Sequence, residues 1–110
     1  MKARYIQRGE SIDFTPETDV AAGDIVKIGS LVGVAKLDIK AGELGALALV
    51  GVYEVETGGT AVAIGTVVSI DPATGKVCAE GTAGAVKLGH AVTKAETSDT
   101  TVLVRLAQGL

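Results

Sequence analysis

Glycine interrupts this chain so often that long elements of secondary structure are disfavoured. The 110 residues include 15 glycines, and the longest unbroken apolar run, residues 46–50, has five members. Between the glycines lie 15 valines and 11 threonines, and such β-branched residues favour strands. Amphipathic helical spacing is scarce. The pattern therefore indicates short strands joined by tight turns.

The size and composition of the chain predict a single domain. With 47% apolar and 21% charged residues, it can bury one modest hydrophobic core. A single cysteine rules out a disulfide scaffold. We therefore expect residues 1–110 to form one mainly β domain, a small β-barrel or β-sandwich of short strands with at most one short helical turn.

Turn residues and apolar alternation locate the expected strands. Asp71-Pro72-Ala73-Thr74-Gly75 is the clearest turn, because proline presets φ and the aspartate can accept a hydrogen bond from the following backbone. It predicts a hairpin between residues 67–70 and 76–79. Alternation places Lys27 in solvent and aligns Val102, Val104 and Leu106 on one strand face. The remaining strands are expected at 25–28, 31–35, 44–50, 52–55, 66–70, 87–92 and 100–106, with a short helical turn at 60–64.

A short motif occurs twice in the first half. Asp19-Val20-Ala21-Ala22-Gly23-Asp24-Ile25 returns nineteen residues later as Asp38-Ile39-Lys40-Ala41-Gly42-Glu43-Leu44. Both copies have a glycine followed by an acidic and an aliphatic residue, which is typical of a tight turn leading into a strand. Two copies are too few for a solenoid. They indicate one turn used twice in a barrel or sandwich.

A basic arm precedes an acidic segment at the start of the sequence. Lys2, Arg4 and Arg8 surround Tyr5 and Ile6, whereas residues 9–24 contain five acidic side chains. The arm, residues 1–8, is either a solvated terminus or first strand, or a segment that clips onto a neighbouring subunit. The net charge of -3 argues against free nucleic acid as a partner, because phosphate neutralisation needs basic residues.

The chain contains no segment that resembles a membrane span or a secretion signal. No run approaches the ~20 apolar residues of a membrane helix, and no basic start is followed by a sustained apolar stretch. We therefore expect no membrane partner and a protein that is not secreted. The single cysteine is compatible with a reducing cytoplasm.

Residues with catalytic or ligating chemistry are few and isolated. Strand parity places the single histidine, His90, on the face of Leu88 and Val92, and no serine has a nucleophile-elbow context. Cys78 has no second cysteine for a metal or redox pair. The glycines lack the spacing of a phosphate-binding loop. We predict no catalytic residue, no cofactor and no metal, and hence a binding or structural role rather than an enzyme.

Read from end to end, the sequence resembles the capsid cement, or head decoration, proteins of tailed phages and prophages. None of the shared features is a catalytic motif, so the resemblance depends on their number and order. Some family members carry a recombinase label, which the missing phosphate-binding loop argues against here. The matching residues include Met1-Lys2-Ala3, Tyr5, Gln7, Gly9, Ile12-Asp13-Phe14-Thr15, Ala22-Gly23-Asp24, Val26, Gly33-Val34-Ala35, Ala41-Gly42-Glu43, Gly45-Ala46, Gly51-Val52, Gly65, the segment 71–77, Gly89, Ala91 and Val102-Leu103-Val104-Arg105-Leu106.

The resemblance implies a protein that binds the outside of a phage head and cements neighbouring subunits of the major capsid protein, often as a homotrimer. It would reside on the virion exterior, and in the host cytoplasm before assembly. No family motif marks the contact residues. From charge and position we expect them in the arm: Lys2, Arg4, Tyr5, Gln7 and Arg8.

Two alternatives stay open at this point. One is a small β-barrel carrier or ligand-binding module, which predicts a lysine at a hairpin tip, and Lys76 lies near one without the expected Met-Lys context. The other is an enzyme that uses scattered carboxylates, which predicts a concave pocket with perturbed acidic groups.

Overall fold

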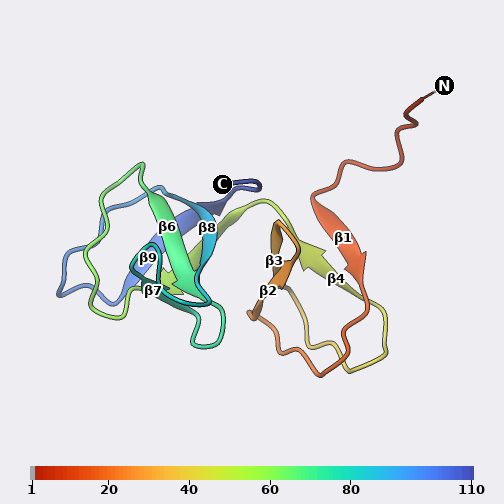
Figure 1. Cartoon of the computed structure of the whole chain (residues 1–110), viewed down its shortest axis with the longest axis horizontal. Helices are drawn as coiled ribbons and strands as arrows, with labels where there is room; N and C mark the ends of the chain where they lie inside the picture. Colours follow the sequence, from red (N-terminus) through yellow and green to blue (C-terminus); the bar gives the residue numbers. More distant parts are fainter. Residues whose placement is uncertain (1) are drawn as a thin grey trace.

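The chain forms short strands in two sheets that lie side by side (Figure 1). The computed structural model describes residues 2–110, in which no helix is present and therefore none that could span a membrane. The first sheet is open, with strand order β1-β4-β3-β2, and the second is a closed barrel, β5-β7-β6-β8-β9. The strands are β1 (Ser11–Phe14), β2 (Ile25–Ile28), β3 (Leu31–Ala35), β4 (Gly45–Ala48), β5 (Val52–Glu56), β6 (Val67–Asp71), β7 (Lys76–Cys78), β8 (Val86–Ala91) and β9 (Thr101–Leu106).

Most of the expected strands are confirmed, and so is the mainly β class. The β6–β7 hairpin pairs Asp71 with Lys76, and its turn is held by the Gly75 N–H, which donates to the Asp71 carbonyl oxygen at 2.7 Å. The predicted helical turn at 60–64 is wrong. Val62 forms an isolated antiparallel bridge with Ala95 instead, so this segment is extended where a helix was expected.

The two copies of the sequence motif pair with each other. Val20 and Ile39 exchange two backbone hydrogen bonds of 2.8 Å. Each motif's first aspartate accepts a backbone N–H of the other copy: Asp38 from Ala22 at 2.8 Å, and Asp19 from Ala41 at 2.9 Å. We call this arrangement the reciprocal aspartate contact. It joins the loop between β1 and β2 to the loop between β3 and β4.

The second half of the chain repeats the pairing scheme of the first. β1 pairs with β4, β4 with β3 and β3 with β2, and correspondingly β5 pairs with β9, β9 with β8 and β8 with β6, all antiparallel. The Gly23 N–H donates to the Ala35 carbonyl at 2.7 Å, and Gly65 donates to Ala91 at 2.8 Å in the matching place. The halves are therefore structural repeats. Among the described strands, β7 is the one without a counterpart.

The main core fills the barrel. Thirteen buried residues form it, and Ile70, Leu88 and Val104 are fully enclosed. Val102, Val104 and Leu106 are all buried, as strand alternation predicts, and Lys27 is exposed.

His90 does not share the face of Leu88, which corrects the prediction from strand parity. The pairing of β8 with β6 shifts register between Val68 and Ser69, and this bulge changes the alternation along β8. Leu88 is therefore fully buried while His90 is exposed.

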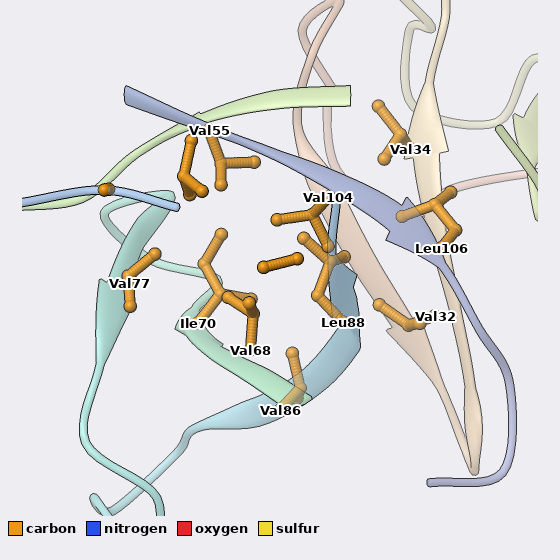
Figure 2. Close-up of a cluster of buried hydrophobic side chains, with 13 residues drawn as sticks. Val32, Val34, Val55, Val68, Ile70, Val77, Val86, Leu88, Val104 and Leu106 are labelled. Carbon is orange, nitrogen blue, oxygen red and sulfur yellow. The ribbon is translucent and has the colours of Figure 1, made fainter. Parts of the chain in front are cut away.

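The open sheet is attached to the barrel through apolar and polar contacts. Figure 2 shows Leu106 of β9 between Val32 and Val34 of β3, and all three belong to the barrel core. Beyond β9, the Gln108 side chain accepts a hydrogen bond from the Val32 N–H at 2.8 Å and donates to the carbonyl oxygens of Val32 and Leu49 at 2.8 and 3.0 Å. One glutamine thereby links the end of the chain to β3 and to the segment after β4.

Candidate interaction surfaces

The N-terminal arm is the most exposed part of the chain. Its described residues, 2–8, are all exposed and form no strand, and the arm extends away from the open sheet (Figure 1). Tyr5 and Ile6 are 78% and 71% exposed. Met1, the first residue of the predicted arm, lies outside the described residues.

The arm starts where the hydrogen bonding of β1 ends. The Glu10 carbonyl accepts a hydrogen bond from the Leu49 N–H at 2.9 Å, and Gly9 has φ +78°, a conformation that turns the chain and suits glycine. Arg8 lies 3.3 Å from Glu10, with both side chains largely exposed, so this ion pair constrains the arm weakly. Lys2, Arg4, Tyr5 and Gln7 are left available for a partner.

A groove lies between the end of β1 at Phe14, the loop that follows it, β2 and the β6–β7 turn. Its volume is about 410 Å³, and we call it the β1–β2 groove. Phe14, Ile25 and Val26, which line it, are only partly buried. Its other lining residues are Pro16, Glu17, Thr18, Asp19, Val20, Asp24, Lys27, Pro72 and Ala73.

Two of the three acidic residues of this groove, Asp19 and Asp24, have structural partners. Asp19 accepts the Ala41 N–H as part of the reciprocal aspartate contact. Asp24 accepts the Ala21 N–H at 3.0 Å and stabilises its own turn. Both side chains lie on exposed residues. The groove thus combines partly buried apolar side chains with an acidic rim.

The remaining reactive side chains are dispersed. His90 is exposed and pairs across strands with Arg105, and Cys78 is a free, partly buried cysteine at the end of β7. No group of three or more His, Cys, Asp or Glu residues that could hold a metal is found in residues 2–110.

Lys76 does not lie at a hairpin tip. It is the first residue of β7, paired in register with Asp71, and its ammonium nitrogen is 3.9 Å from a Glu56 carboxylate oxygen. The tip consists of residues 72–75. This placement gives no support to a carrier module that modifies a lysine at the tip.

Sequence reasoning found the arm but missed the groove. The groove depends on β1, which was not predicted because Ile12 and Phe14 lie in a segment dominated by acidic residues. In the structural repeat β1 corresponds to β5, and Ile12-Asp13-Phe14 occupies the positions of Tyr53-Glu54-Val55. Both segments alternate apolar, acidic and apolar residues. Comparing the two halves of the sequence at this spacing would have indicated the strand.

Comparison with known proteins gives one match. A sequence model of a family described as phage cement protein matches residues 6–106. This confirms the family indicated by the resemblance. No curated protein and no solved structure matches the chain.

Proposed function

Since the chain belongs to the phage cement protein family, we propose that it binds the outer surface of an assembled phage head and joins neighbouring subunits of the major capsid protein. The observation that carries this proposal is the family match across residues 6–106. The protein would act by binding alone, without a reaction. It would be present in the host cytoplasm before assembly.

The proposed mechanism is additive binding on a repeating lattice. Each copy makes a small contact, and copies held together gain affinity because later contacts form at high local concentration. If the protein binds the expanded shell better than other states of the shell, it stabilises that state by linkage. A homotrimer suits this mechanism, because three linked copies present three contacts.

The arm is the proposed contact segment, either with the capsid surface or with a neighbouring copy of the chain. Lys2, Arg4, Tyr5, Gln7 and Arg8 are exposed and lie outside the folded sheets, so they can bind a partner without any loss of core packing. Three positive charges and an aromatic side chain suit an acidic protein surface, and an extended segment can also pair with a free strand edge.

Deletion of residues 1–8 tests this function. The variant should keep the fold and lose co-sedimentation with purified expanded heads. A charge-matched control replaces the exposed Lys36, Lys40 and Lys94 with alanine, which removes three positive charges elsewhere and should leave binding largely intact. Unchanged sedimentation of the deletion variant would contradict the role of the arm. Failure of the intact protein to bind heads would contradict the function itself.

The proposed homotrimer has a separate test. Light scattering of the purified protein should give about three times the 11.0 kDa chain mass. A stable monomer at every concentration would mean that the protein does not trimerise by itself, and would contradict a preformed trimer.

A further inference from the structure

The two structural repeats differ by one strand. In the barrel, β7 lies between β5 and β6, parallel to β5 and antiparallel to β6. The corresponding strands of the open sheet are β1 and β2, and no strand of residues 2–110 pairs with either of them on that side. The open sheet is thus the same unit as the barrel without its closing strand.

Burial differs between the repeats where that strand is missing. Ile70 of β6 is fully buried, whereas Ile28, its counterpart on β2, is 38% exposed. Eleven of the thirteen residues of the main core come from the second repeat, and the other two, Val32 and Val34, come from β3 of the open sheet. The separate cluster of the open sheet holds three buried residues, with Phe14 and Val26 only partly buried against it. A sheet with free edges and a half-exposed apolar interior is suited to accept another strand.

We propose that the β1–β2 groove binds the N-terminal arm of a second copy of this chain as an added strand, parallel to β1 and antiparallel to β2. The orientation is that of β7 in the other repeat. This inference rests on the proposed function in one respect, namely that the arm makes a contact during assembly. Its test uses the purified protein alone, without phage heads.

Charge favours the arm as the occupant. The groove is lined by Glu17, Asp19 and Asp24 with one lysine, whereas the arm carries three basic residues and no acid. Ile6 is 71% exposed in the isolated chain and would be covered in the groove, whereas Tyr5 would lie on the outer face of the added strand, because consecutive side chains of a strand alternate. Opposite charges at the rim and apolar contact inside would act together.

The arm cannot enter its own groove in this orientation. Two parallel neighbouring strands need a crossover connection of about a dozen or more residues, and Gly9 and Glu10 alone separate the arm from β1. A parallel contact with β1 must therefore come from another copy. Head-to-tail exchange of this kind closes into a ring when the rotation allows it, as in the proposed homotrimer.

The β7 strand also sets the expected register. Val77 points inward and is 9% exposed, its neighbour Lys76 is paired with Glu56, and Cys78 is paired with Ser69. Placing Ile6 at the position of Val77 brings Tyr5 opposite Thr15 and Gln7 opposite Lys27, since Thr15 and Lys27 are the counterparts of Glu56 and Ser69. Gln7 and Lys27 should therefore be cross-strand neighbours between copies.

Disulfide trapping between two single-cysteine chains tests this geometry. In a Cys78→Ser background, one full-length chain carries Gln7→Cys and the other carries Lys27→Cys. Mixed and oxidised, they should form a heterodimer at least about tenfold faster than Gln7→Cys mixed with Lys94→Cys, because docking raises the local thiol concentration. Lys94 is exposed and lies in the loop between β8 and β9.

A second variant separates docking from chance collision. Adding Ile6→Asp to the Gln7→Cys chain should abolish the excess rate, because the new carboxylate would lie against apolar side chains and beside the acidic residues of the groove. The fold should be unaffected, since the arm lies outside both sheets. Equal trapping rates at Lys27 and Lys94 would overturn the proposal. So would a chain carrying both Gln7→Cys and Lys27→Cys that closes only within itself. A third outcome would also overturn this inference: the arm deletion abolishes head binding, but Gln7→Cys and Lys27→Cys chains show no faster trapping. The arm would then contact the shell and not a second copy.

Discussion

Gln108 makes the polar connection between the end of β9 and the open sheet. Its side chain satisfies both the N–H and the carbonyl oxygen of the buried Val32 and the carbonyl oxygen of Leu49. Gln108→Ala should lower the free energy of unfolding by about 2 kcal/mol, because buried backbone groups lose their partners. Urea denaturation measures this loss. Gln7→Ala in the exposed arm is the matched control, and equal midpoints for the two variants would contradict the prediction.

Gly89 and Gly33 occupy matching positions on β8 and β3, where the neighbouring strand approaches closely. A Cβ at Gly89 would overlap the Arg105 carbonyl oxygen, and one at Gly33 would lie 2.9 Å from the Leu47 Cβ. Gly89→Ala should lower stability by about 3 kcal/mol, since the overlap is with backbone atoms, and Gly33→Ala by less, since its overlap with the Leu47 Cβ is smaller. Thermal denaturation should show this order. His90→Ala, on the exposed neighbour, should change little, and a reversed order would refute the argument.

At the residue scale, the sequence predicts burial well where strands are regular. Alternation correctly places Lys27 outside and Val102 and Val104 inside. It fails at His90, because the pairing of β6 and β8 contains a bulge. A bulge is a mismatch between two paired strands, so the sequence of one strand alone does not reveal it. Gln108 was missed for a similar reason: its partners lie far away in the sequence.

At the scale of elements, turns with strong local chemistry were predictable. The β6–β7 hairpin follows from Pro72 and Gly75, and β2 and β3 have the expected bounds. β1 was not predictable from its own four residues, since pairing with β4 decides its structure. The segment around Val62 was misread because a single bridge to Ala95 outweighs the local preference.

The sequence motif predicted two similar turns but not the reciprocal aspartate contact that joins them. Asp19→Ala and Asp38→Ala should each lower the free energy of unfolding by about 1 kcal/mol, because each removes the acceptor of a backbone N–H. The double variant should lose less than the sum, since both contacts hold the same Val20–Ile39 bridge. Chemical denaturation of the four chains measures the coupling. The exposed Asp13→Ala serves as control, and strict additivity would contradict a shared contact.

At the scale of the whole molecule, the repeat explains an uneven distribution of stability. The chain spans 48 × 34 × 23 Å, with a closed barrel in one half and an incomplete one in the other. Val32 and Val34 join the barrel core from the open sheet, so β3 is stabilised by both halves. β1 and β2 depend on fewer buried contacts, and each is an edge strand of the open sheet.

Amide hydrogen exchange should reveal this difference. Paired amides of β6, β8 and β9 should exchange at least about tenfold more slowly than those of β1 and β2, because local opening costs less where few apolar groups are buried. In the trapped complex between Gln7→Cys and Lys27→Cys chains, protection should increase in β1 and β2, while the barrel stays unchanged. The Lys94→Cys adduct controls for tethering alone. Uniform protection in the free chain would contradict the uneven stability, and unchanged β1 and β2 in the complex would show that the arm adds no strand.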